Sequence, residues 1–319
     1  MARSVLSAAH FQDEDAAFAY VEAHLWPQGP VCPFCGEQER IGRLQGQTTR
    51  PGLRKCYACK KPFTVRIGTI FESSHLALRY WLQVIHLMCA SKKGISTRQI
   101  QRMLKCSMKT AWHLTHRIRL AMDPGVGAGP LGGEGKIVEA DEAFLSNSPH
   151  TRKKPGYQHK VGILGLVERG GDHRTIVLDG APSKAAIVPH LQRHVHPEST
   201  LHTDGAQYYK ALWVVAAHES VDHSKSEYAR KGQRGDVVHV NTLEGFFSVF
   251  KRGMIGTYQH VESQHLHRYL AEFDFRQNTR ERLGIDDTMR AEIALRGVRG
   301  KRLTYETIGG VEQEEPIPF

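Results

Sequence analysis

The stretch IVEAD at residues 137–141 begins a run of predicted strands that continues with VGILGLV at 161–167 and RTIVL at 174–178. Each stretch is short and rich in β-branched residues, as strands are. Four more elements follow: a predicted helix at 185–195, a strand at 200–203, and helices at 241–252 and 265–278. Strands that first follow one another and then alternate with helices predict an α/β layered domain.

Upstream of this domain the pattern is different. Residues 123–135 hold six glycines and two prolines, which predicts a linker. Before the linker, apolar residues recur at helical spacing over 10–25, 76–90, 96–104 and 108–121. We therefore expect an N-terminal helical segment (1–30), a cysteine-bearing segment (31–72), a helical region (73–122), the linker (123–135), the α/β domain (136–280) and a C-terminal extension (281–319).

Composition excludes several classes of protein. The chain has 319 residues, of which 40% are hydrophobic and 24% charged. This apolar fraction is too high for a disordered chain. No apolar run approaches the ~20 residues that span a bilayer, and the N-terminus lacks a secretory pattern, so we expect a cytoplasmic protein without a membrane partner. Six cysteines in that compartment are then not expected to form disulfides.

Positive charge is concentrated in one segment. Residues 40–122 contain 17 Lys and Arg but only one acidic residue, Glu72, which gives +16, whereas the whole chain carries +10. The remainder is therefore mildly acidic. A soluble chain with such a one-sided segment is expected to bind nucleic acid, although a solvated basic face without a partner would have the same composition.

Four cysteines have the spacing of a metal site. Cys32 and Cys35 form one CxxC pair, and Cys56 and Cys59 form a second pair after 20 intervening residues. Two such pairs can close a tetrahedron of thiolates around Zn²⁺. A site with four protein ligands leaves no position for a substrate, so we expect a structural zinc.

Residues 96–119 predict a helix-turn-helix that binds DNA. Ser96 or Thr97 can cap the first helix and Ser107 the second. In the second helix the apolar residues are expected to face inward, which leaves for DNA the side chains of Lys109, His113, Arg117 and Arg119. A helical hairpin in a protein core would have a similar pattern.

Three acidic residues are candidates for a second metal site. Asp141 ends a predicted strand, Asp204 follows another, and Glu244 lies on a predicted helix two turns before Lys251. Three converging carboxylates repel one another unless divalent cations neutralise them, and oxygen ligands favour Mg²⁺ or Mn²⁺. Spacing alone does not choose these three over the other nearby acids, namely Glu139, Glu142, Asp179 and Asp222.

The motifs, taken in order, resemble a known family. They are CPFCG, KCYACKK, KKGISTRQIQ, VEADEAFL, LHTDG, DHS, HVNTLEGFFSVFKRGMIGTYQHV and HLHRYLAEFDFR. This series resembles the zinc-ribbon DDE transposases of bacterial insertion sequences, the ISXO-like group, over residues 31–278. The resemblance implies an RNase H-like catalytic domain preceded by a zinc ribbon and a helix-turn-helix region.

The resemblance also implies roles for individual residues. Asp141, Asp204 and Glu244 match the metal-binding acids, and Lys251 matches a lysine that helps to place the DNA end. Asn241 lies one helical turn before Glu244 and is an alternative third ligand; His223 fits the family pattern without a firm role. Arg152, Lys153, Lys154 and Lys160 are candidates to follow the DNA.

The implied activity is metal-dependent cleavage at the ends of a DNA element, followed by joining of the 3′-hydroxyl to target DNA. Such a transposase would bind the terminal inverted repeats and target DNA, and would act as a homodimer or larger assembly because two ends are processed together. Two other functions fit the same residues: a non-enzymatic zinc-ribbon and helix-turn-helix regulator, and an RNase H-like nuclease that cleaves without joining.

Overall fold

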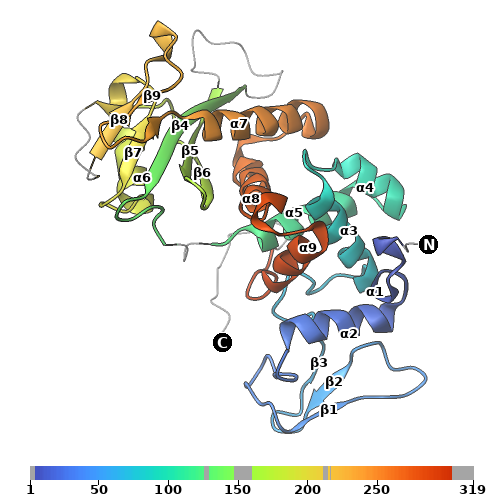
Figure 1. Cartoon of the computed structure of the whole chain (residues 1–319). Helices are drawn as coiled ribbons and strands as arrows, with labels where there is room; N and C mark the ends of the chain where they lie inside the picture. Colours follow the sequence, from blue (N-terminus) through green and yellow to red (C-terminus); the bar gives the residue numbers. More distant parts are fainter. Residues whose placement is uncertain (1–3, 126–128, 147–159, 211–214, 216, 304–319) are drawn as a thin grey trace. The chain divides into compact units, whose positions relative to one another are not determined.

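The computed structural model describes residues 4–125, 129–146, 160–210, 215 and 217–303. The chain divides into two compact units, one formed by residues 1–123 and 281–319 and the other by residues 124–280 (Figure 1). The described part of the expected C-terminal extension, residues 281–303, thus belongs to the first unit. Among the described residues, no helix has the length and apolar character needed to cross a membrane.

The first unit begins with helices and a small sheet. It contains the short helix η1 (Val5–Ser7), α1 (Ala9–Gln12) and α2 (Glu14–Leu25). The helix expected at 10–25 is divided at Asp13, whose side chain caps α2 by accepting from the Ala16 N–H at 2.8 Å. Three antiparallel strands follow in the order β1 (Ile41–Arg43), β2 (Arg54–Cys56) and β3 (Pro62–Phe63).

Four longer helices complete this unit, namely α3 (Leu78–Ala90), α4 (Thr97–Leu104), α5 (Met108–Met122) and α9 (Asp287–Arg296). Ser96 and Gln99 form a reciprocal capping box at the start of α4. Lys105 ends α4 in the left-handed conformation (φ 50°), and Ser107 then caps α5. Helix α9, which the sequence pattern did not predict, packs against α2, α3 and α5. The short helix η6 (Glu281–Leu283) precedes it.

The second unit is built on a five-stranded mixed sheet in the order β6-β5-β4-β7-β8. Its strands are β4 (Ile137–Ser146), β5 (Lys160–Glu168), β6 (His173–Val177), β7 (Thr200–Thr203) and β8 (Ala217–Ser220). Strands β4, β5 and β6 are antiparallel neighbours, whereas β7 runs parallel to β4 and β8 parallel to β7. The α/β layering expected from the sequence is therefore present.

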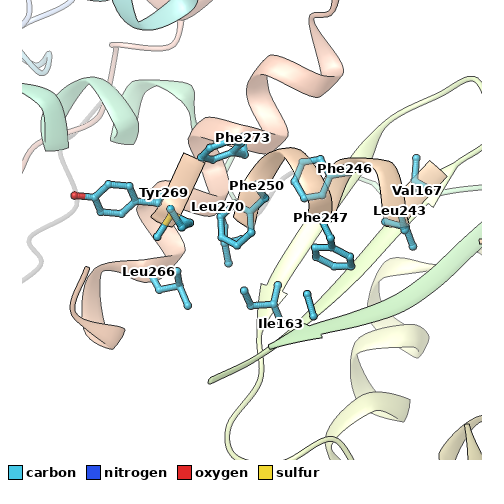
Figure 2. Close-up of a cluster of buried hydrophobic side chains, with 12 residues drawn as sticks. Ile163, Val167, Leu243, Phe246, Phe247, Phe250, Leu266, Tyr269, Leu270 and Phe273 are labelled. Atoms are coloured by element: carbon cyan, nitrogen blue, oxygen red, sulfur yellow. The ribbon is translucent and has the colours of Figure 1, made fainter. Parts of the chain in front are cut away.

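Helices cover both faces of this sheet. On one face, α6 (Lys184–His194) buries Ile187 and Leu191 against Val138, Ala140 and Leu201. On the other face, α7 (Asn241–Gly253) and α8 (Leu266–Asn278) pack around a cluster of phenylalanines with Ile163 and Val167 (Figure 2). Because side chains alternate along a strand, residues 139, 141 and 143 of β4 face α7, and residues 138, 140 and 142 face α6.

Smaller elements link these layers. Helix η2 (Gln207–Tyr209) follows β7, η3 (His223–Lys225) follows β8, and a π-helical turn, η4 (Met254–Tyr258), and η5 (Ser263–His265) join α7 to α8. A hairpin of two short strands, β9 (Arg230–Lys231) and β10 (Val237–Val238), lies in the chain between β8 and α7.

Candidate active site and metal centre

The four predicted zinc ligands lie together in the first unit. Cys32 and Cys59 have their sulfur atoms 3.7 Å apart, as do Cys35 and Cys56. At a Zn–S bond length of about 2.3 Å, the edge of a tetrahedron is about 3.8 Å, so these distances suit zinc. The Cys59 N–H donates to Cys56 Sγ and lowers the pKa of that thiol to about 7, which favours the thiolate that binds metal. These four residues therefore fit a structural zinc site.

Asp141 lies in the interior of β4, whereas the sequence pattern placed it at the end of a strand. The strand continues to Ser146 because Ala143 and Leu145 extend the apolar alternation into the α7 core. The parallel neighbour β7 stops earlier, with Thr203 opposite Ala140. Asp204, the next residue, therefore follows β7 at the level of Asp141, whose side chain lies on the α7 face of the sheet.

Helix α7 carries the other two candidate residues. Leu243, Phe246, Phe247 and Phe250 anchor this helix on the sheet, and Glu244 and Lys251 are exposed. The two exposed residues are seven positions apart, two turns along one side of the helix. Asn241, the alternative third ligand, is the first residue of α7 and is also exposed.

Electrostatic coupling links the three acids. Burial, together with the negative charges of Asp204 and Glu244, raises the pKa of Asp141 to about 7, although the hydrogen bond from the Glu142 N–H and the nearby His223 act in the opposite direction. Nδ1 of His223 lies 3.6 Å from Oε1 of Glu244. The charges of two neighbouring acids thus disfavour ionisation of the partly buried Asp141 carboxyl, and His223 lies beside one of these acids, Glu244.

The carboxylate oxygens of the three acids do not gather as closely as the cysteine sulfurs do. Among the described residues, two groups of three or more possible ligands have donor atoms within 4.8 Å of one another: the four cysteines, and a cluster of His202, Glu219 and Asp236. Asp141, Asp204 and Glu244 do not form such a group.

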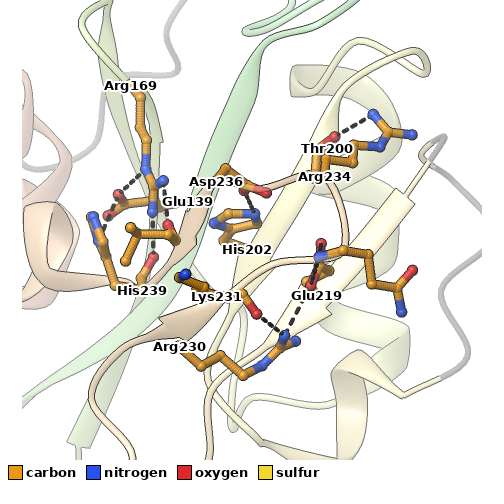
Figure 3. Close-up of polar contacts among 12 residues, drawn as sticks. Glu139, Arg169, Thr200, His202, Glu219, Arg230, Lys231, Arg234, Asp236 and His239 are labelled. Atoms are coloured by element: carbon orange, nitrogen blue, oxygen red, sulfur yellow. Dashed lines mark hydrogen bonds and ion pairs between the residues drawn. The ribbon is translucent and has the colours of Figure 1, made fainter.

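The competing acids have other partners. Glu139 is fully buried and accepts hydrogen bonds from Arg169 Nε and the Thr242 hydroxyl (Figure 3). Glu142 points to the opposite face, where the hydroxyls of Tyr208 and Tyr209 donate to it. Asp222 accepts from Ser224 and pairs with Lys225, and Asp179 is exposed. These contacts occupy Glu139, Glu142 and Asp222, whereas the pKa of Asp141 is affected by both Asp204 and Glu244.

The residues assigned to DNA on the second helix have different surroundings. Lys109 is exposed and His113 is half-buried, but Arg117 and Arg119 are buried, which contradicts the expectation that they face a groove. Arg117 donates to the Glu72 carbonyl at 2.6 Å and lies over the Trp81 ring, and burial lowers its pKa to about 10. More of the surface of α5 is buried than its sequence suggests, because the aliphatic stems and guanidinium groups of Arg117 and Arg119 also pack in the core. Arg152, Lys153 and Lys154 lie outside the described residues, and Lys160 begins β5.

The cluster of His202, Glu219 and Asp236 was missed by sequence reasoning. Its members come from β7, β8 and the loop of the β9–β10 hairpin, and no spacing motif links them. The alternation of β7 does offer a signal: in Leu201-His202-Thr203-Asp204, the polar His202 and Asp204 share a face. Burial lowers the pKa of His202 to about 4, so its imidazole is neutral.

Comparisons with known proteins agree with these features. Residues 130–278 match the ISXO2-like transposase domain, and residues 12–62 match the transposase zinc-ribbon domain. A protein in the transposable element ISH50 of Halobacterium salinarum is 28% identical over 265 residues, which are 79% of this chain and 86% of that protein. A chain in the crystal structure of a pre-cleavage Mos1 transpososome aligns with this protein at 12% sequence identity. The alignment covers 63% of this chain and 70% of that chain, but the TM-score of 0.25 is too low to support an argument.

The two family matches follow one another in the order expected of zinc-ribbon transposases, and the zinc-ribbon match contains all four cysteines described above. The ISH50 protein supports the same assignment along most of both chains. The chain therefore belongs to the zinc-ribbon, ISXO2-like family of insertion-sequence transposases.

Proposed function

We propose that this protein cleaves the ends of a DNA element by metal-dependent hydrolysis and joins the resulting 3′-hydroxyl to target DNA, with Asp141, Asp204 and Glu244 as the metal-binding acids. The observation that carries this proposal is the electrostatic coupling of the three acids: the charges of Asp204 and Glu244 raise the pKa of Asp141. Carboxylates that disfavour one another's ionisation are suited to bind divalent cations.

The topology of the second unit supports an RNase H-like fold for it. We infer this from a sheet in which three antiparallel strands, β6-β5-β4, are extended by two parallel strands, β7 and β8. In this arrangement β4 is the central strand, and its acid faces the end of its parallel neighbour. The first two acids of the proposed site therefore come from β4 and from the residue that follows the adjacent strand β7.

The three acids supply oxygen ligands, which suit Mg²⁺ or Mn²⁺. When bound at such a site, two divalent cations stabilise the attacking and leaving oxygens of a phosphodiester during in-line displacement. Hydrolysis and strand joining are both displacements of this kind, so one site serves both.

Other residues of the chain would bind and orient the DNA. Lys251 is exposed on α7, two turns after Glu244, and its ammonium group can contact a phosphate. His223 lies within 3.6 Å of Glu244 and is placed to orient that carboxylate. The aromatic face of α7 fixes this helix on the sheet, so the exposed side chains of Glu244 and Lys251 have a rigid support.

We infer that α4 and α5 form a DNA-binding helix-turn-helix whose contact surface differs from the one expected from the sequence. Its exposed cations lie before and along α4 and on the first turn of α5, namely Lys92, Lys93, Arg98, Arg102, Lys105 and Lys109. We call these six residues the α4 basic surface. Recognition helices commonly contact bases with their N-terminal residues, and Lys109 is in that position. Because transposition processes two DNA ends together, we expect a dimer or larger assembly on DNA.

A strand-joining assay with terminal-repeat DNA and Mg²⁺ tests the proposed activity. Asp204→Asn should abolish cleavage and joining and retain DNA binding, whereas Asp179→Asn, an exposed acid on the same unit, should retain all three. If Asp204→Asn still joins DNA, the assignment of the acids is wrong. If the wild-type protein binds the repeats without cleaving them in Mg²⁺ or Mn²⁺, the chain is a regulator; cleavage without joining identifies a nuclease.

A further inference from the structure

A second group of possible metal ligands lies in the second unit, apart from the three acids. His202 on β7 is fully buried, Glu219 on β8 is 7% exposed, and Asp236 comes from the β9–β10 hairpin (Figure 3). One donor atom from each residue lies within 4.8 Å of the other two. His202 and Glu219 are direct partners in the parallel pairing of β7 with β8, so their side chains share one face of the sheet.

The contact between His202 and Asp236 does not have the geometry of a hydrogen bond. Nε2 of His202 lies 3.0 Å from Oδ2 of Asp236. Yet both ring nitrogens and both carboxylate oxygens are buried, and none has a hydrogen-bond partner among the residues that the structure describes. Buried polar atoms without hydrogen-bond partners destabilise a fold, so four of them in one place require an explanation. A cation between the two side chains would satisfy the lone pairs that face each other.

The spacing of the donor atoms fits a metal ion. Ligand bonds of about 2.0–2.1 Å from nitrogen or oxygen to zinc give a tetrahedral edge of about 3.3 Å. The separation of 3.0 Å between His202 and Asp236 is close to this edge. The zinc ribbon of the same chain shows the same pattern, with sulfur atoms at a tetrahedral spacing.

Surrounding groups hold Glu219 in place and leave room for Asp236. Arg230 donates to Oε2 of Glu219 at 3.0 Å, and the Gln233 N–H donates to Oε1 at 3.1 Å. A carboxylate has about four lone-pair positions, so Glu219 keeps free positions for a cation. Gly232 gives room for the cluster, because a Cβ at this position would lie 2.4 Å from Oδ1 of Asp236. Hydrogen-bonded carboxylates of this kind are typical around bound metals.

We propose that His202, Glu219 and Asp236 form a second metal site, which binds a divalent first-row transition ion such as Zn²⁺. One imidazole and two carboxylates suit such an ion better than Mg²⁺, which rarely takes a nitrogen ligand. The metal ties the hairpin to β7 and β8. Its role is structural: it fixes the segment that leads from the hairpin into α7, the helix that carries Glu244.

Zinc content of the full-length protein tests this site. All variants carry Asp204→Asn, so that zinc bound at the three acids is not counted. After equilibration with Zn²⁺ and removal of free metal, we expect two zinc ions per chain: one in the ribbon and one at this cluster. Adding His202→Gln should reduce the count to one, and adding His218→Gln should leave it at two. His218 is the matched control, because it is a histidine next to Glu219 on β8 whose side chain is hydrogen-bonded to the Thr203 hydroxyl and is not part of the cluster.

Unfolding temperatures supply a second measurement. Zn²⁺ should raise the unfolding temperature of the His218→Gln protein more than that of the His202→Gln protein, since ligands that bind only the folded state stabilise it. If His202→Gln does not fold, Asp236→Asn replaces it. One zinc per chain before His202 is changed, or two afterwards, would overturn the proposal. Equal stabilisation of both proteins by Zn²⁺ would also overturn the proposal. It would show that His202 and Asp236 form a contact that does not need a metal.

Discussion

Asp141 on β4 and Gly165 on β5 are direct partners in the antiparallel pairing of the two strands. Both therefore face α7. A Cβ on residue 165 would lie 2.7 Å from Phe247 and 2.9 Å from Leu243, so a side chain there is incompatible with the present position of the helix. The absence of a side chain opposite Asp141 lets α7, with Glu244, approach the sheet.

Gly165→Ala should therefore displace α7 or destabilise the second unit. Overpacking of this kind costs about 1–3 kcal/mol, which urea unfolding can measure. Gly162→Ala on the same strand is the control, because its nearest contacts would be 3.4 Å, close to ordinary van der Waals distance. Equal stability of the two variants would show that α7 is held less tightly than its contacts indicate. In the joining assay, Gly165→Ala should lose more activity than Gly162→Ala.

The pKa of Asp141 predicts a pH dependence of stability when divalent cations are removed by a chelator. Its folded pKa is about 7, against an ordinary value of 3.8, so the folded protein binds more protons than the unfolded chain between these values. The contribution of Asp141 to stability must then fall as pH rises through that window. Asp141→Asn removes this effect and should be more stable than the wild type near pH 8, with the difference shrinking toward pH 4.

Thermal unfolding of both proteins, measured across this pH range, checks the sign. Mg²⁺ binds the ionised carboxylate, so it should stabilise the wild type more near pH 8 than near pH 5 and should have little effect on Asp141→Asn. A stability difference that does not change with pH would show that Asp141 has an ordinary pKa. The test compares two proteins that share every other titrating group.

The zinc ribbon gives a separate prediction. Cys56→Ser should remove one zinc per chain and destabilise the first unit, because a structural zinc contributes directly to folding. Cys106→Ser is the control, since Cys106 lies outside the group of four. Metal analysis should give one zinc fewer for Cys56→Ser only. The same loss from Cys106→Ser would contradict the assignment of ligands.

Short-range sequence patterns predicted most of the helices and strands. The elements that these patterns did not predict depend on packing between residues far apart in the sequence. The limits of α4 could be predicted, since Ser96 and Gln99 form its cap within one turn of the helix. Strand β8 has the polar sequence Ala217-His218-Glu219-Ser220, and it becomes a strand only because β7 pairs with it. Helix α9 has little sequence contrast with its surroundings and is stabilised by α2, α3 and α5.

The same distinction applies to the sites. The cysteines form a local motif, so their grouping could be predicted from spacing. Asp141, Asp204 and Glu244 come from three separate elements, and only the resemblance to a family selected them from the other acids. Spacing could not reveal His202, Glu219 and Asp236, whose contacts depend on how a hairpin folds over two strands. Arg117 and Arg119 were misplaced because a cation on a helix is usually exposed, yet here the core extends around them.

The α4 basic surface and the buried Arg117 make opposite predictions for two similar substitutions. Arg102→Ala removes an exposed cation from α4 and should weaken binding to terminal-repeat DNA without changing the unfolding temperature. If Arg102 contacts a phosphate, the magnitude of the slope of log affinity against log salt should fall by about 0.9.

Arg117→Ala instead removes a guanidinium that is 4% exposed and donates to the Glu72 carbonyl, so it should lower the unfolding temperature. At a temperature where Arg117→Ala remains folded, its salt dependence should match that of the wild type, because the side chain does not reach DNA. A smaller salt slope for Arg117→Ala, together with an unchanged salt slope for Arg102→Ala, would contradict the α4 basic surface. It would indicate that Arg117 on α5 contacts DNA.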